Sequence, residues 1–319
     1  MKYSINSKKK VLVTGGSGFL GRRIVDECMN LGYEVLFPRS KEMDLYDIEN
    51  LKKFLKNNNP EVIVHSAAYY GGIGICNSEP ANLFNNNTLM TANLYKAAAE
   101  CGVDKVVAVG SACAYPALVD GNMSEDDFWN GEFHETVEAY GSSKKIQLIA
   151  QNAYYKQYGL KGNHLILTNL YGEDDVFTAY RSHVVAALIK RFSDEIEKGS
   201  EKIVNWGDGT PEREFIYVGD AAKALAMSIE LNHDLKPINI GTGIGTSIKE
   251  LAEIVAKNLG FKGALEWDTS KPNGVARKVL DVSRMAKVFP GFAPITFQEG
   301  LRKTLKWYLP NKKEADSRC

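Results

Sequence analysis

The chain has 319 residues, 44% of them hydrophobic, and carries 39 basic and 39 acidic side chains. This length and apolar content suffice for a large buried core, arranged as one large domain or two closely packed ones. A formal net charge of zero gives no basic excess of the kind that nucleic-acid-binding proteins show. No stretch approaches the roughly 20 consecutive apolar residues of a membrane helix. We therefore expect neither a nucleic acid nor a membrane as a partner.

The cysteines and the N-terminal segment bear on the compartment. The chain has five cysteines, an odd number, and no C-x-x-C pair, so the sequence indicates neither a disulfide framework nor a zinc site. Residues 1–10 are mostly polar and lack the apolar core of a secretory signal. We expect reduced thiols, a cytoplasmic location and no bound metal.

Strand and helix patterns alternate along the first half of the chain. Apolar runs predict strands at residues 10–15, 33–38, 61–67, 104–112, 160–172 and 237–243. Helical periodicity predicts helices at residues 18–32, 48–58 and 93–102, and two short Asn runs, 57–59 and 85–87, are typical of loops or caps. Fully apolar segments such as VLV, VIV and VVAV fit strands that are buried on both faces. We therefore predict an α/β fold with a Rossmann-type doubly wound parallel sheet.

The second half of the chain is less regular. Its helical patterns lie at residues 183–192, 247–260 and 295–309. Loops rich in Gly, Pro, Asp and Lys separate them, and we predict a smaller C-terminal lobe made of residues 173–215 and 244–319. The larger domain, residues 1–172, then regains a return segment of about 216–243, whose strand we expect to join the first sheet.

A glycine-rich segment follows the first predicted strand and opens the first helix. Residues 14–21 read TGGSGFLG, which has the spacing G-x-x-G-x-x-G. Glycines let the backbone turn tightly and approach a pyrophosphate, and the helix N-terminus offers free N–H groups and the positive end of its dipole. In this strand–turn–helix context the segment indicates a dinucleotide site more strongly than a merely tight turn. The expected cofactor contacts here are Gly15, Gly18, Phe19, Leu20 and Gly21.

The end of the second strand indicates which dinucleotide binds. An acidic residue there would bind the ribose 2′-hydroxyl of NAD. Instead, Arg39, Ser40 and Lys41 form a basic, hydroxyl-bearing segment. Together with Arg22 at the start of the helix, this segment favours a 2′-phosphate, so we predict NADP(H). Asp44 follows and is expected to face the adenine, and the alternative is that the cations are solvated surface charges.

Tyr140 and Lys144 stand four residues apart in AYGSSKK, a spacing that places both on one helix face. A lysine ammonium near a phenol lowers the pKa of the phenol, so the tyrosine can exchange a proton near neutral pH. Such a pair arises by chance in a chain with 15 tyrosines, but this one follows a nucleotide loop and a strand that ends at Ser111. We predict that Ser111 and Tyr140 reach a carbonyl oxygen, while Lys144 also holds the nicotinamide ribose.

Together these motifs resemble the extended short-chain dehydrogenase/reductase family that acts on nucleotide sugars. TGGSGFLG, HSAA (65–68), Ser111 and Tyr140-x-x-x-Lys144 carry this likeness. Longer segments narrow it to the GDP-L-fucose synthase branch. They read VHSAAYYGGI, GSACAYP, TNLYGEDDVF, SHVVAALIKRF, NWGDGTPEREFIYVGDAA and DTSKPNGVARKVLDVS.

The resemblance extends over nearly the whole chain, from Val11 to Leu309. It implies a 3,5-epimerase and 4-reductase that acts on GDP-4-keto-6-deoxymannose, so the expected partner is a GDP-linked keto-sugar. The family is commonly a homodimer, formed through a helix bundle that includes the Tyr-x-x-x-Lys helix. Ala67 in HSAA and His183 are implied cofactor contacts, beside Lys144.

The resemblance also assigns the groups that epimerise the sugar. In a 4-keto sugar the carbonyl acidifies the protons on C3 and C5, and one group must remove a proton while another returns one on the opposite face. The family gives these roles to residues that correspond here to Cys113 and His183, two side-chain types that titrate near neutral pH. Reduction follows, with hydride delivered to C4 and Tyr140 protonating the oxyanion. The alternative is that Cys113 packs in the core and His183 caps the next helix.

The resemblance places the GDP-sugar against the C-terminal lobe. The implied substrate contacts are Asn169, Arg191, Trp206, Arg213, Lys271 and Arg277. Arginine suits a pyrophosphate because its planar guanidinium donates hydrogen bonds in pairs. Alternatively, Trp206 packs under its loop and Arg277 is a surface charge.

Several positions around the sugar depart from the family pattern. Ala112 stands where the family has a second serine, ETVEAY lacks the proline of T-N-E-P-Y, EDDVF replaces P-x-D-N-F, and YRSH (180–183) is unusual. The sugar is therefore left open, because relatives of this branch act on GDP-4-keto-heptoses, some as 4-reductases only. An NAD-retaining 4-epimerase or 4,6-dehydratase is disfavoured by the basic FPRSK segment. A non-catalytic dinucleotide binder is disfavoured by the intact Ser111, Tyr140 and Lys144.

Overall fold

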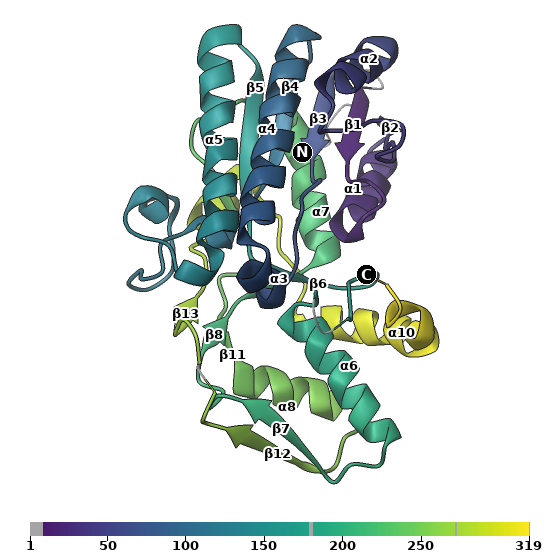
Figure 1. The fold of residues 1–319 in the computed structure, drawn as a ribbon, viewed down its shortest axis with the longest axis vertical. Coiled ribbons are helices and arrows are strands. Elements are labelled where there is room, and N and C mark those ends of the chain that lie inside the picture. Colours follow the sequence, from purple (N-terminus) through teal and green to yellow (C-terminus); the bar gives the residue numbers. More distant parts are fainter. Residues whose placement is uncertain (1–8, 179–180, 272, 319) are drawn as a thin grey trace.

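The computed structural model describes residues 9–178, 181–271 and 273–318, with a six-stranded sheet and a smaller lobe at one end of it (Figure 1). The sheet has the order β10-β5-β4-β3-β1-β2, and every adjacent pair is parallel. Its strands are β1 (Lys10–Thr14), β2 (Glu34–Leu36), β3 (Val62–His65), β4 (Lys105–Ser111), β5 (Lys161–Leu167) and β10 (Ile238–Ile240). Because β2 and β3 lie on opposite sides of β1, the carboxyl ends of β1 and β3 form a topological switch point. The predicted doubly wound sheet is confirmed, including the return of the strand in 237–243.

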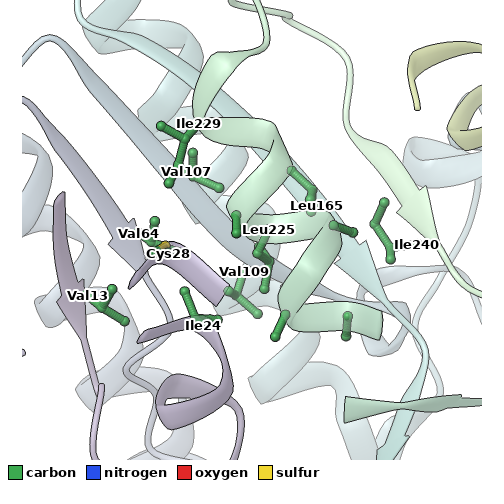
Figure 2. Packing of buried hydrophobic residues seen from close by; sticks show 14 of the residues in the cluster. Val13, Ile24, Cys28, Val64, Val107, Val109, Leu165, Leu225, Ile229 and Ile240 are labelled. Carbon is green, nitrogen blue, oxygen red and sulfur yellow. The ribbon is translucent and has the colours of Figure 1, made fainter. Parts of the chain in front are cut away.

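Side chains of successive strand residues belong to two apolar clusters, one on each face of the main sheet. Val11 and Val13 of β1 belong to one cluster, whereas Leu12 between them belongs to another. Side chains alternate across a strand, so a strand that is apolar at every position can cover helices on both faces. Figure 2 shows the first cluster, in which Cys28 and Leu225 meet the sheet valines. The helices on this face are α1 (Phe19–Asn30), α7 (Val218–Met227) and the short α9 (Ser283–Val288). Those on the other face are α2 (Ile48–Asn58), α4 (Pro80–Glu100) and α5 (Glu138–Tyr158).

The smaller lobe has an apolar core of its own. Phe177, Phe192 and Tyr308 are fully buried in it, and the rings of Phe177 and Tyr308 stack with centroids 4.4 Å apart. Its helices are α6 (Val184–Glu197), α8 (Ile248–Leu259) and α10 (Phe297–Ala315). Its strands are β7 (Lys202–Trp206), β8 (Glu212–Arg213), β11 (Thr246–Ser247), β12 (Ala264–Asp268) and β13 (Arg277–Lys278). The strands form two small sheets, β12-β7 and β11-β8-β13, at the far side from the N-terminal helices (Figure 1).

The strand predicted at 160–172 is two strands in two sheets. β5 belongs to the main sheet, whereas β6 (Asn169–Tyr171) pairs with β9 (Phe215–Tyr217). Thr168 separates them, and its Oγ1 donates to the carbonyl of Glu214 at 3.1 Å. This bond joins Thr168 to the segment that precedes β9, and the chain leaves the main sheet at this threonine.

Two other predicted elements differ in extent. The helix predicted at 93–102 begins at Pro80, so the Asn run 85–87 is helical and not a loop. Asn87 is buried there, and its side chain is bonded to protein groups that compensate for the poor helix propensity of asparagine. The strand predicted at 33–38 is limited to β2.

Two kinds of feature are absent from the described ranges. No helix within them combines the length and the apolarity that a membrane crossing requires. Within the same residues, no group of three or more His, Cys, Asp and Glu side chains could hold a metal ion. The predicted boundaries of the two domains stay a prediction.

Candidate active site

The glycine-rich segment turns between β1 and α1 at the switch point. Gly15 has a φ of +67°, in the left-handed region, and a Cβ there would lie 2.9 Å from the Cα of Ala67. A Cβ at Gly21 would collide with the carbonyl oxygen of Gly15, to which the N–H of Gly18 donates at 2.9 Å. The turn thus requires small residues, and α1 begins at Phe19 with its first N–H groups at the carboxyl edge of the sheet. Such an edge stabilises an anion.

The segment that follows β3 is bonded to the end of β1. Ser66 Oγ donates to the carbonyl of Thr14 at 2.7 Å, and the Ala67 N–H donates to Thr14 Oγ1 at 3.2 Å. The same hydroxyl lies 2.8 Å from Nδ1 of His65. Burial lowers the pKa of His65 to about 3, so its ring is neutral. These bonds place the predicted contacts Gly15 and Ala67 side by side.

The cations expected around a 2′-phosphate have different surroundings in the structure. Arg39 and Lys41 are exposed in the turn that follows β2. Arg22 instead forms an ion pair with Asp174 at 2.8 Å and donates to the carbonyl of Ser17 at 3.0 Å. A contact of Arg22 with the 2′-phosphate stays a prediction, and in this structure the guanidinium is paired with a nearly buried carboxylate.

Leu20 and Asp44, two further predicted cofactor contacts, have packing and turn roles in the structure. Leu20 packs against the core of the sheet. Asp44 accepts the N–H of Tyr46 at 2.9 Å, and its own N–H donates to Asn50 Oδ1 at 2.8 Å. Their contacts with a cofactor stay a prediction.

Ser111, Tyr140 and Lys144 come together where β4 ends against α5. Ser111 is the last residue of β4, and its Oγ accepts the N–H of Cys113 at 3.2 Å, which begins a short 3-10 turn. Lys144 Nζ donates to the carbonyl of Val109 at 2.8 Å and lies 5.7 Å from the centroid of the Tyr140 ring. Tyr140 and Lys144 are both buried. The shared helix face predicted from their spacing is confirmed, and it faces the end of β4.

The ionisation of Tyr140 differs from the prediction. Burial raises the pKa of Tyr140 above its usual value, and the thiols of Cys113 and Cys76 raise this pKa further. Burial also lowers the pKa of Lys144 to about 8. The prediction that the phenol titrates near neutral pH is wrong for this structure, because desolvation of the phenolate dominates. A phenol that stays protonated at neutral pH is suited to giving a proton.

Cys113 and His183 approach Tyr140 from two different elements. Cys113 packs with Cys76 in the small cluster that contains Tyr140. His183 is the N-cap of α6, and its ring stacks on that of Tyr70 with centroids 4.9 Å apart. The centroids of the Tyr70 and Tyr140 rings are 6.1 Å apart, so Tyr70 lies between His183 and Tyr140. Burial lowers the pKa of His183 to about 4, so its imidazole is neutral at pH 7.

Four predicted substrate residues lie on the small sheets of the C-terminal lobe. Arg213 and Arg277 occupy the adjacent strands β8 and β13, and Arg277 Nε donates to Glu212 Oε2 at 2.9 Å. Trp206 ends β7, and Lys271 is exposed shortly after β12, the strand paired with β7. The Trp206 side chain is 73% exposed, which excludes the alternative that it packs under its loop. These residues offer cations and an aromatic face to a ligand.

Arg191 and Asn169, the other two, are held by protein groups. Arg191 donates to Asn205 Oδ1 and, at 3.5 Å, to the carbonyl of Val204. Asn169 Nδ2 donates to the carbonyl of Glu214 at 2.8 Å. Their contacts with a substrate stay a prediction.

Comparison with known proteins places this geometry in a family. The model of the NAD dependent epimerase/dehydratase family matches residues 11–241, more than half of the chain. The chain belongs to this family. Its predicted position in the GDP-L-fucose synthase branch is confirmed by curated relatives that match over nearly their whole length.

Two such relatives and one solved structure illustrate the likeness of this epimerase/dehydratase family member. The GDP-L-fucose synthase of Escherichia coli (strain K12) is 34% identical over 316 residues, which cover 96% of this chain and 98% of the relative. The GDP-L-colitose synthase of Yersinia pseudotuberculosis is 34% identical over 310 residues, covering 95% and 99%. The structure titled MlghC, GDP-mannoheptose C4 reductase from Campylobacter jejuni with NADP bound, has a TM-score of 0.83 and 27% identity, covering 94% of this chain and 98% of that one.

Sequence reasoning missed Tyr70 and Asn87 in this family member. Tyr70 is part of the segment VHSAAYYGGI, but nothing in its spacing assigned it a role. Asn87 belongs to the run expected to be a loop, yet its buried side chain accepts the N–H of Tyr69 at 2.9 Å and donates to the Tyr69 carbonyl at 2.8 Å. If the helix had been predicted at its full length, Asn87 would have stood among the apolar residues of one helix face. A polar residue at such a position needs a bonding partner, and this was the signal in the sequence.

Glu214, between the two lobes, was missed as well. It is fully buried, and its carboxylate accepts the N–H groups of Gly243 at 2.8 Å and Leu280 at 2.7 Å. Burial raises the pKa of this carboxyl group, while the backbone donors oppose the shift. Glu214 thereby ties the segment before β9 to the segments that follow β10 and β13.

Proposed function

We propose that this protein uses NADPH to reduce the C4 ketone of a GDP-4-keto-6-deoxyhexose or GDP-4-keto-heptose, after epimerisation at C3 and C5. The observation that carries the proposal is the set of groups around one phenol. Ser111 and Lys144 join Tyr140 at the end of β4, and Cys113 and His183 approach it from two other elements. We call Ser111, Tyr140 and Lys144 the reduction group, and Cys113 with His183 the epimerisation pair. The names of the relatives, which include synthases of GDP-L-fucose and GDP-L-colitose, support the same chemistry.

The glycine-rich segment fits a dinucleotide. No side chain can be added at Gly15 or Gly21, so the backbone before α1 is not covered by side chains. The free N–H groups at the start of α1 would then stabilise a pyrophosphate. The residues that would hold the cofactor are Gly15, Gly18, Phe19, Leu20, Gly21, Ala67, Lys144 and His183, with Arg39 and Asp44 at its adenosine end. When bound, NADPH supplies the hydride for C4.

The reduction group protonates and positions the C4 oxygen. Tyr140 gives it the phenolic proton, which the raised pKa keeps in place until it is needed. Ser111 accepts a backbone N–H, so its own hydroxyl hydrogen is free to bond the same oxygen. The Lys144 ammonium, anchored on the Val109 carbonyl, then stabilises the phenolate that remains.

The epimerisation pair acts on the carbons beside the ketone. One member removes a proton from C3 or C5, and the other returns a proton on the opposite face. Cys113 stands on the turn after β4 and His183 on the N-cap of α6, so the two side chains start from separate elements, as attack on two faces requires.

A single incubation tests the proposal. The protein is mixed with NADPH and GDP-4-keto-6-deoxymannose in heavy water, and the product is analysed by mass and proton spectra. We expect oxidation of NADPH and deuterium at C3 and C5 of a product reduced at C4. If NADPH is oxidised neither with this hexose nor with the corresponding heptose, the proposal is wrong, and an NAD-retaining nucleotide-sugar 4-epimerase becomes the better hypothesis.

The second candidate is a 4-reductase without epimerase activity that acts on a GDP-4-keto-heptose. The residues around the sugar favour it, because Ala112 and the segments ETVEAY and EDDVF depart from the hexose pattern. The likeness to a structure titled GDP-mannoheptose C4 reductase supports the same candidate. NADPH oxidation without deuterium at C3 and C5 would select it over the first.

The choice of NADP over NAD rests on the turn after β2. Arg39 is exposed there, ready to pair with a 2′-phosphate. We expect Arg39→Ala to raise the KM for NADPH about tenfold, since a charge-assisted bond is lost, and to leave the KM for NADH unchanged. Arg22→Ala is the companion variant, and we expect a smaller rise because Arg22 is already paired with Asp174. An unchanged ratio of the two KM values in Arg39→Ala would contradict the assignment.

We also propose a homodimer formed through α4 and α5, and a cytoplasmic location. The two helices pack side by side and expose Leu89 and Ile149, large apolar side chains that a partner copy would cover. Light scattering would give the mass of a dimer for the native chain and of a monomer for Ile149→Glu. A monomeric native chain would contradict the proposal, and cell fractionation tests the location.

A further inference from the structure

Tyr70 lies between the two parts of the site. Its ring stacks on the His183 imidazole, with centroids 4.9 Å apart and an angle of 28° between the planes. The same ring lies 6.1 Å from that of Tyr140. Its hydroxyl is hydrogen-bonded to Nε2 of His183, and the Tyr70 side chain is partly exposed to solvent. Tyr70 therefore touches His183 on one side and water on the other.

The backbone that carries Tyr70 is fixed on the side of α4. Buried Asn87 satisfies both backbone groups of Tyr69, at 2.9 Å and 2.8 Å, and also donates to the Leu83 carbonyl of its own helix at 2.7 Å. An amide that makes three bonds in a buried place holds its partner tightly, because losing any of them would leave a desolvated polar group.

The same segment is also fixed on the side of His183. The Gly72 N–H donates to the carbonyl of Arg181 at 3.0 Å, and a Cβ at Gly72 would collide with the carbonyl of Ser182. The residues that precede His183 and those that follow Tyr70 are thus in direct backbone contact. The backbone, and not a mobile side chain, determines that the two rings meet.

The bond between Tyr70 and His183 has a preferred direction. Burial keeps the pKa of His183 low, so the ring is neutral at pH 7, with one nitrogen that donates and one that accepts. A phenol is a better donor than acceptor, and the unprotonated nitrogen of imidazole is a strong acceptor. The Tyr70 hydroxyl then donates to Nε2, and the ring hydrogen resides on Nδ1.

We propose that Tyr70 is a positioning residue that fixes the His183 ring in this tautomer and relays protons to it from solvent. The inference rests on the proposed function. When Nδ1–H gives its proton to a sugar carbon, Nε2 takes the Tyr70 hydroxyl proton, and water returns a proton to the Tyr70 oxygen. One proton moves from water to the enolate carbon, whose negative charge passes to the hydroxide left in solvent. No electrons are transferred to an outside group, and the imidazole stays neutral throughout. His183 is then the member of the epimerisation pair that returns the proton.

The first test needs no substrate. In protein labelled with 15N-histidine, nitrogen shifts at pH 7 report the tautomer of each ring, and loss of a signal in His183→Asn assigns the ring in question. We expect protonated Nδ1 in the native protein and a mixture of tautomers in Tyr70→Phe. Tyr69→Phe is the matched control, because its hydroxyl bonds Glu79 at 2.5 Å and does not touch the histidine. Identical His183 shifts in the native protein and in Tyr70→Phe would overturn the proposal.

The second test measures the reaction. With NADP⁺, which cannot give hydride, deuterium uptake at C3 and C5 in heavy water isolates epimerisation from reduction. Loss of a hydrogen bond and its relay should slow this uptake about tenfold in Tyr70→Phe, with the Kd for NADPH unchanged and Tyr69→Phe at the native rate. Native uptake rates in Tyr70→Phe would also overturn the proposal. If the native protein neither takes up deuterium nor oxidises NADPH, the proposed function fails, and the nitrogen shifts still decide the placement of Tyr70.

Discussion

The reduction group and the epimerisation pair surround one phenol, yet the protein holds them in different ways. The reduction group stands on β4 and on the long helix α5, and two of its members are bonded to backbone groups at the end of β4. The epimerisation pair stands on a 3-10 turn and on a helix N-cap, and Tyr70 lies between His183 and the phenol. Strands and long helices open less readily than loops. We therefore expect substitutions and pH to separate the two activities.

The largest difference between the effects on reduction and on epimerisation is expected from Tyr140→Phe. Removing the proton donor should lower the rate of NADPH oxidation about a thousandfold, within the range for a lost general acid. Deuterium uptake at C3 and C5 with NADP⁺ should fall much less, because the epimerisation pair is untouched and Ser111 still bonds the C4 oxygen. NADPH oxidation by Tyr140→Phe at a native rate would show that another group protonates the C4 oxygen.

The opposite separation is expected from Cys113→Ser, which keeps the size of the side chain but removes the thiol. Deuterium uptake should fall about a hundredfold. Any reduced product should keep the starting configuration at the carbon that is no longer exchanged, as the proton spectrum would show. Native uptake in this variant would assign Cys113 to packing, the alternative that the sequence left open.

The pH dependence sharpens the comparison, because burial lowers the pKa of one group on each side. The pKa of His183 is lowered to about 4, so its ring stays neutral, and its 15N shifts should stay constant, as the pH falls to about 5. The pKa of Lys144 is lowered to about 8, so its ammonium is lost, and NADPH oxidation should decline, as the pH rises through that value. The nitrogen shifts and the rate of NADPH oxidation should therefore change at opposite ends of the pH range. A change of the His183 shifts near pH 6.5, the ordinary value for histidine, would contradict the first part.

The smallest effect is expected from Asn87→Asp, which removes the two amide donors of the buried side chain but keeps an acceptor. We expect a loss of about 1–3 kcal/mol in the free energy of unfolding and a severalfold decrease in deuterium uptake, while the KM for NADPH is unchanged. Asn85→Asp, exposed in the same run, is the control and should leave both unchanged. Thermal unfolding and the uptake assay measure the two effects, and an unaltered melting temperature would rule out the clamp on Tyr69.

Much of the fold could be predicted because its signals are local. A strand such as VLV, apolar at each position, implies helices on both faces, and the glycines of TGGSGFLG imply a tight turn into a helix. The division of 160–172 into two strands was out of reach, since it depends on a bond from Thr168 to Glu214, 46 residues away. The Asn run 85–87, predicted as loop or cap, is helical, because the tertiary bonds of Asn87 override the low helix propensity of asparagine.

In the site, too, local features could be predicted from the sequence, and features that depend on distant segments could not. By itself, the sequence determined the glycine loop, the strand that ends at Ser111 and the shared face of Tyr140 and Lys144, because spacing along one element sets them. Only the tertiary structure decided that Arg22 pairs with Asp174, that the pKa of Tyr140 rises, and that Tyr70 meets a histidine 113 residues away. Burial and contacts between distant segments determine which groups pair and how they ionise, and neither is written in the spacing of residues along the chain.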